Sequence, residues 1–79
     1  MKKTLDKFSI SESGVVVAVD GERKIKRRLY DMGITSGAEI YLRKKAPLGD
    51  PIEVTVRSYE LSLRNSEAAC ITLEVKTNA

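Results

Sequence analysis

The chain has 79 residues, the length of one small domain. Its 14 basic and 11 acidic residues give a formal net charge of +3, a balance that suits an anionic partner but does not require one. There is no histidine and only one cysteine, Cys70, which excludes an internal disulfide and a zinc site built from nitrogen and sulfur ligands of one chain. We therefore expect no metal site and no cofactor. Without histidine, the usual general base near neutral pH, an enzyme is not expected either.

The N-terminal segment and the apolar runs bear on cellular location. Residues 1–7 are partly basic, but no apolar segment of the kind found in a signal peptide follows them. The longest aliphatic run, 15–19, is far shorter than the roughly 20 residues that cross a bilayer. The sequence therefore predicts a cytoplasmic protein with no direct insertion into a membrane. Cys70 is expected to be a small core residue.

The first predicted element is a strand over residues 14–19, whose sequence Gly-Val-Val-Val-Ala-Val is rich in β-branched residues and is followed by the turn-forming pair Asp-Gly. The next is a helix over 22–32. Its residues Ile25, Leu29 and Met32 are spaced i, i+4 and i+7, so they lie on one face. This apolar face predicts that the helix packs on the rest of the domain and buries Leu29.

Both ends of this helix carry further signals. Glu22 falls in the predicted first turn, where a carboxylate is favourable beside the positive end of the helix dipole. Gly33 follows the last apolar position and fits a left-handed C-cap, a conformation that a residue without Cβ adopts at little cost.

Alternation of apolar and polar residues with a period of two predicts four more strands, over residues 38–45, 52–57, 59–63 and 71–76. The segment 46–51, Ala-Pro-Leu-Gly-Asp-Pro, interrupts the pairing, because proline donates no ladder hydrogen bond and Gly-Asp favours a turn. Ser58 is expected at a bend or bulge, and 64–68 is expected to form one turn of helix.

These elements predict a mostly β fold, a small five-stranded barrel with one α-helix between the first two strands. Closure of the barrel removes the exposed edges that an open sheet of this size could not protect. The chain has no internal repeat and no linker, so residues 1–79 are expected to form a single domain with its core over about 14–76. Residues 77–79 are expected to fray.

Several segments of this pattern resemble the ferrous iron transport protein A (FeoA) family. The resemblance runs from about Gly14 to Val75 and rests on Arg28-Leu29-Tyr30-Asp31-Met32-Gly33-Ile34, Gly37, Ala46-Pro47-Leu48-Gly49-Asp50-Pro51, Leu61-Ser62-Leu63-Arg64 and Glu67-Ala68. It implies an SH3-like barrel and a role as a non-enzymatic accessory or adaptor protein in bacterial ferrous iron uptake. The implied partner is the cytoplasmic GTPase domain of the membrane transporter for ferrous iron, which would place the protein in the cytoplasm or at the inner membrane through that partner.

The family is associated with a transition metal, yet this chain offers only carboxylates and carbonyls as ligands, and exposed carboxylates bind ferrous iron weakly. We therefore expect iron to be handled by the partner. Asp50 and Glu53 do not form a catalytic pair in this interpretation, because neither is expected to have the raised pKa that a general acid requires.

The outer face of the predicted helix is the first candidate for partner binding. Its candidate residues are Lys24, Arg27, Arg28, Tyr30 and Asp31. Such a face can dock on an acidic protein surface, on phospholipid headgroups or on RNA, or it can simply be solvated. A small basic barrel that binds nucleic acid is the alternative function, but no nucleic acid is expected, because Tyr30 is the only aromatic residue in the basic run.

The loop that interrupts the alternation is the second candidate. Its candidate residues are Pro47, Leu48, Gly49 and Asp50. The two prolines are consistent with a rigid connection that serves stability alone. A stiff loop with Leu48 at its tip would equally provide a preorganised apolar contact for a partner, because little entropy is lost when it binds.

Overall fold

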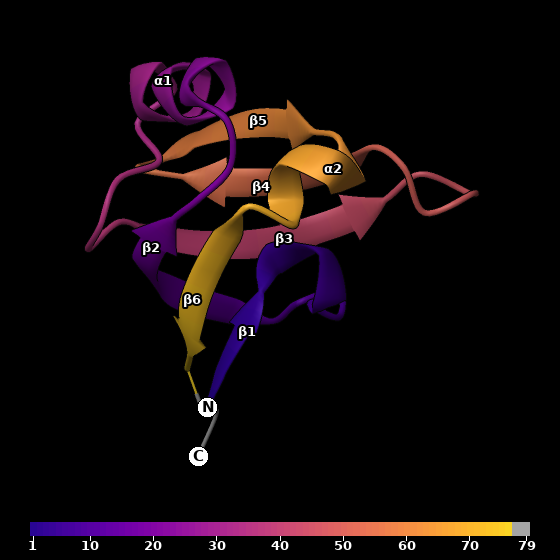
Figure 1. Cartoon of the computed structure of the whole chain (residues 1–79). Helices are drawn as coiled ribbons and strands as arrows, with labels where there is room; N and C mark the ends of the chain where they lie inside the picture. Colours follow the sequence, from indigo (N-terminus) through magenta and orange to yellow (C-terminus); the bar gives the residue numbers. More distant parts are fainter. Residues whose placement is uncertain (77–79) are drawn as a thin grey trace.

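The computed structural model describes residues 1–76, so the expectation for 77–79 lies outside the described residues. The elements (Figure 1) are, in chain order, β1 (Lys2–Thr4), the 3-10 helix η1 (Leu5–Lys7), β2 (Ser13–Val19), α1 (Arg23–Asp31), β3 (Glu39–Lys45), β4 (Ile52–Val56), β5 (Tyr59–Leu63), α2 (Asn65–Ala68) and β6 (Ile71–Val75). The strands form one antiparallel sheet in the order β1-β6-β2-β3-β4-β5.

The predicted fold class is confirmed, since the domain is mostly β with α1 inserted between two neighbouring strands, β2 and β3. The predicted number of strands is wrong, because β1 adds a sixth. Its residues Lys2 and Thr4 pair with Glu74 and Thr72 of β6, which lies at the other end of the sequence. A polar segment of three residues has no periodicity of its own, and only this distant pairing makes it a strand.

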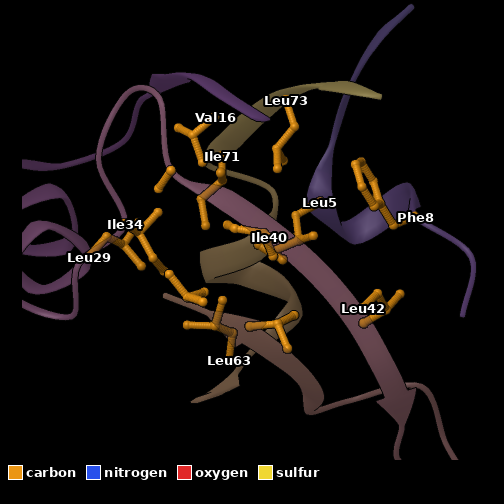
Figure 2. Close-up of a cluster of buried hydrophobic side chains, with 14 of the residues drawn as sticks. Leu5, Phe8, Val16, Leu29, Ile34, Ile40, Leu42, Leu63, Ile71 and Leu73 are labelled. Carbon is orange, nitrogen blue, oxygen red and sulfur yellow. The ribbon is translucent and has the colours of Figure 1, made fainter. Parts of the chain in front are cut away.

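The N-terminal segment also contributes to the core. Leu5 and Phe8 are fully buried, although the sequence analysis assigned no element before residue 14. Leu5 is the first residue of the 3-10 helix η1 and Phe8 is the residue after it, and residues three apart in such a helix project from the same side. The turn therefore points both side chains into the domain, and Figure 2 shows Phe8 and Leu42 at one end of the hydrophobic cluster, with Leu29 and Ile34 at the other.

The alternation predicted for the strands is confirmed by burial in β3, β4 and β6, whereas in β5 only Leu63 is buried and Tyr59 is exposed. The inward positions are fully buried: Ile40, Leu42, Ile52, Val54, Val56, Leu63, Ile71 and Leu73. In β2 a register shift between Val16 and Ala18 interrupts the alternation, so that Val17 and Ala18 are both exposed and Val19 is buried. Cys70 is half-buried and packs at the margin of the core, just before β6, so it is less enclosed than expected.

Helix α1 is the element that the sequence predicted best. Leu29 is fully buried, and Ile25 and Met32 pack beside it. Gly33 has φ +87°, as expected of a left-handed C-cap. Its N–H donates to Tyr30 O at 2.9 Å, and the next N–H, that of Ile34, donates to Leu29 O at 3.0 Å, which is the Schellman pattern.

The N-terminus of α1 differs from the prediction. Glu22 is the N-cap residue with an extended backbone, and the first turn contains no acidic residue. The Glu22 side chain makes no capping hydrogen bond. The helix therefore begins at Arg23, one residue later than predicted, and the Glu22 side chain lies just before its first turn.

The tip of the β4–β5 hairpin holds the C-terminus of α1. Arg57 and Ser58 have φ values of +49° and +73°, so they form a tight two-residue turn where a bend or bulge was expected. Arg57 Nε donates to Gly33 O at 3.2 Å, and the Tyr59 hydroxyl donates to Met32 O. The guanidinium thus lies at the negative end of the helix dipole, and α1 is fixed on the sheet at this end.

Candidate docking surfaces

The candidate residues of the helix are exposed along α1. One stripe, spaced i, i+3, i+4 and i+7, consists of Arg23, Lys26, Arg27 and Tyr30, which we call the α1 stripe. Together with Gly21 it lines a shallow depression of about 380 Å³. The Tyr30 side chain, 46% exposed, forms one end of the stripe. Arg23 and Lys26 were not among the predicted site residues, and counting back from Tyr30 at helical spacing would have found both.

Arg28 has a different role from the other cations of the helix. Its Nε lies 3.3 Å from Glu67 Oε2 of α2. Glu67 is the one buried charged residue in the part of the chain that the structure describes. Its Oε1 also accepts a hydrogen bond from Arg64 N at 3.0 Å, in the manner of a capping box. Arg28 therefore joins α1 to α2, although most of its side chain is exposed.

The second candidate surface is the β3–β4 loop, residues 46–51. Leu48 lies at its tip and is 96% exposed, the most exposed large apolar side chain of residues 1–76. The loop is closed beneath it by two backbone hydrogen bonds, Gly49 N to Ala46 O at 2.7 Å and Ala46 N to Pro51 O at 3.0 Å. These two hydrogen bonds restrict the backbone on both sides of Leu48.

The other side of this loop is bonded to α2. Asn65 Nδ2 donates to Gly49 O at 2.8 Å, and Asn65 N donates to Asp50 Oδ1 at 2.9 Å. Asp50 therefore caps the N-terminus of α2, which agrees with a structural role in a turn and leaves Leu48 as the free end of the loop.

The two candidate surfaces do not form one site. Figure 1 shows α1 and the β3–β4 loop at opposite sides of the molecule, with α2 lying between them. Both are nevertheless bonded to α2, one through the Arg28–Glu67 ion pair and the other through Asn65. One partner would have to extend across the domain to reach both surfaces.

Neither surface resembles a catalytic or metal centre. Among residues 1–76 no three side chains of the types His, Cys, Asp and Glu converge on one point. Glu53, considered above beside Asp50, pairs instead with Lys44 at 3.5 Å. Away from these surfaces, a hydrogen bond from Lys3 lowers the pKa of Glu12, and one from the N-terminal amine lowers the pKa of Glu74.

Comparison with known proteins identifies the family. Residues 3–75 match the FeoA domain family. The chain belongs to the FeoA family. It is 33% identical over 76 residues to an Fe(2+) transport protein A/Fe(2+) transporter FeoB fusion protein of Porphyromonas gingivalis. The match covers 95% of this chain but only 9% of that relative, so the chain spans a small part of the fusion protein.

Solved structures of FeoA proteins have the same fold. A FeoA-like protein from Clostridium acetobutylicum superposes with a TM-score of 0.91 at 42% identity, covering 99% of this chain and 91% of that one. A Stenotrophomonas maltophilia FeoA in complex with zinc, described as an SH3 domain protein, gives a TM-score of 0.79 at 32% identity, covering 91% and 89%. The predicted SH3-like barrel and the FeoA resemblance are therefore confirmed. Within residues 1–76 no helix is long and apolar enough to cross a membrane.

Proposed function

We propose that this protein is a non-enzymatic accessory protein of ferrous iron uptake that docks on the cytoplasmic GTPase part of the FeoB transporter. The observation that carries the proposal is the fusion protein of Porphyromonas gingivalis, in which a FeoA-like segment belongs to the same chain as FeoB. Fusion holds two modules at a high effective concentration, and it supports an association between the same two modules when they are separate chains. The protein would then work at the cytoplasmic side of the membrane through its partner.

The surface of the domain supports binding rather than chemistry. It offers an exposed basic helix face and an apolar loop tip whose backbone is restricted by hydrogen bonds. Within residues 1–76, neither surface carries a cluster of acidic or metal-binding side chains. Preorganised surfaces lose little entropy on association. An adaptor that tunes the assembly or the GTPase cycle of the transporter needs only such surfaces.

The experiment is a calorimetric titration, in which this protein is added to the purified cytoplasmic domain of FeoB from the same organism. We expect a saturable complex with a dissociation constant in the micromolar range or tighter. Leu48→Asp, which leaves the core untouched, tests the loop in the same assay and should weaken the complex if the loop is a contact. Pro47→Ala is its matched control, a neighbouring change that retains the apolar tip.

The proposal fails if the FeoB domain does not bind. Binding of RNA with an affinity that falls steeply with salt would favour the alternative function, because release of counterions from phosphates produces that dependence. The log–log slope should then flatten by nearly one unit for each phosphate contact removed.

A further inference from the structure

Most cations of α1 have no carboxylate partner. Carboxylates of residues 1–76 pair with the N-terminal amine, Lys3, Arg43, Lys44 and Lys76, and with only one cation of α1, Arg28. The unpaired cations outside α1 are scattered along the chain, whereas Arg23, Lys24, Lys26 and Arg27, which also have no carboxylate within 4.0 Å among residues 1–76, are neighbours. Four cations without such a partner are therefore concentrated in five consecutive residues of one helix.

This arrangement works against the stability of α1. Arg23 and Lys24 are the first two residues of the helix, where a positive charge opposes the dipole, and no acidic residue lies in the first turn. Arg23 is also four residues before Arg27 and three before Lys26, and like charges at those spacings repel. None of these four cations forms an ion pair within residues 1–76 that would offset this repulsion. A local rule broken without internal compensation is expected where a surface serves a partner.

The shape of the α1 stripe adds a second observation. Its three cations and Tyr30 line a shallow, open depression of about 380 Å³ beside Gly21. The hydroxyls of Tyr41 and Tyr59 form hydrogen bonds within the domain, whereas that of Tyr30 forms none with residues 1–76. The depression thus combines cations at its rim with an aromatic ring whose polar end is available.

We propose that the α1 stripe binds an acidic segment of the cytoplasmic part of FeoB. The carboxylates of that segment pair with Arg23, Lys26 and Arg27, and an apolar side chain between them enters the depression against Tyr30. This inference rests on the proposed function, because it names the surface and the partner chemistry of the same association.

Two other anionic partners fit the stripe less well. A peripheral protein at a bilayer usually adds apolar side chains that enter the headgroup region beside its cations. The most exposed apolar side chain, Leu48, belongs instead to the β3–β4 loop, and Figure 1 shows that loop on the opposite side of the molecule from α1. A single-stranded nucleic acid would use several aromatic rings for stacking, whereas Tyr41 and Tyr59 belong to β3 and β5 and leave Tyr30 alone on the stripe.

The test compares two variants of equal charge in calorimetric titrations with the cytoplasmic domain of FeoB, at 50 and 300 mM salt. Arg23→Gln/Arg27→Gln removes two cations of the stripe. Lys2→Gln/Lys7→Gln removes two exposed cations from the N-terminal segment and is the matched control. At low salt we expect the stripe variant to bind about tenfold more weakly, and the control to stay within about twofold of the unmodified protein.

Two further readouts define the contact. Tyr30→Ala should weaken the complex at both salt concentrations, because its contribution is apolar, whereas the effect of the arginines should shrink at 300 mM as salt screens them. Arg23→Lys/Arg27→Lys should restore most of the low-salt affinity. Circular dichroism melts of all variants should show that the domain stays folded.

The outcomes separate the two proposals. If FeoB binds the unmodified protein and the stripe variant equally, the stripe is not the contact and this inference is wrong, although the proposed function stands. If FeoB binds neither, the proposed function fails and this inference fails with it. Binding of the unmodified protein to phosphatidylglycerol vesicles or to RNA, lost in the stripe variant while the affinity for FeoB is unchanged, would also overturn it.

Discussion

Replacing Gly33 by alanine should destabilise the domain by about 2–3 kcal/mol. Two effects contribute. At φ +87° a residue with a Cβ is strained by about 1–2 kcal/mol. The new Cβ would also lie 2.7 Å from the Tyr59 hydroxyl oxygen, which must move and lose its hydrogen bond to Met32 O. A hydrogen bond of this kind contributes about 1 kcal/mol net.

The chain contains the matched control for this substitution. Gly37 has φ +93°, but no atom lies within 4 Å of the position of its Cβ, so Gly37→Ala should show the strain alone. Tyr59→Phe removes the oxygen that clashes, and in that background Gly33→Ala should cost about 1 kcal/mol less than in the unmodified protein. Stability is measured by urea and thermal unfolding, monitored by circular dichroism. The loss of about 2–3 kcal/mol expected for Gly33→Ala corresponds to a decrease of about 10–20 °C in Tm for a domain of this size.

Equal losses for Gly33→Ala and Gly37→Ala, with no effect of Tyr59→Phe on either, would refute this account. The contact between the β4–β5 hairpin and the C-terminus of α1 would then contribute nothing to the free energy of unfolding. The strain of the left-handed conformation alone would account for the destabilisation at both glycines.

Three further predictions concern other contacts of the fold. Leu29→Ala should cost about 2–5 kcal/mol in unfolding free energy, because Leu29 is fully buried, and a melting curve shifted by only a degree or two would show that it is not. Arg28→Glu should cost about 1–2 kcal/mol more than Arg27→Glu, since only Arg28 lies beside the buried Glu67 carboxylate, and equal losses would exclude the ion pair. Glu12→Gln should lower the stability of the domain at neutral pH, because the hydrogen bond from Lys3 lowers the pKa of the Glu12 carboxyl in the folded state. The stabilisation by Glu12 is present above the unfolded-state pKa and disappears as the pH falls through the folded-state pKa. A difference in stability between the variant and the unmodified protein that persists in acid would contradict this prediction.

The parts of the fold that the sequence predicted are those encoded within a few residues. Ile40 and Leu42 alternate with polar neighbours, and burial on one face of a strand follows from that period. Leu29 and Gly33 likewise follow from helical spacing and from a residue type that suits a left-handed cap.

The parts that were missed depend on distant residues. The β4–β5 turn lacks the Asn-Gly or Asp-Gly pair that normally signals its type, and Arg57 is held at positive φ by hydrogen bonds to Gly33 and Thr35 of another segment. β1 exists only through its pairing with β6. Neither relation has a signal in the local sequence.

The candidate surfaces were predicted in outline. Exposure of the helix face and of the loop tip follows from charge patterning and from the turn residues, and both are exposed. The sequence could not show that Arg28 and Asp50 are engaged by α2, because their partners Glu67 and Asn65 are far along the chain. Both residues thus have a structural role that the sequence did not reveal. Partner binding by the candidate residues stays a prediction.

A helix of four residues does not hold its shape alone in water, because nucleating the first turn costs more than so few hydrogen bonds return. α2 is therefore maintained by its contacts with the rest of the domain, which are Asp50 on one side, Arg28 on the other and the core around the fully buried Ala68. Its amide protons should exchange with solvent through a local opening that also releases the β3–β4 loop. A ligand that binds Leu48 would suppress this opening and reduce the mobility of Arg28. Binding at the β3–β4 loop would thereby reduce the mobility of α1 without any change of fold.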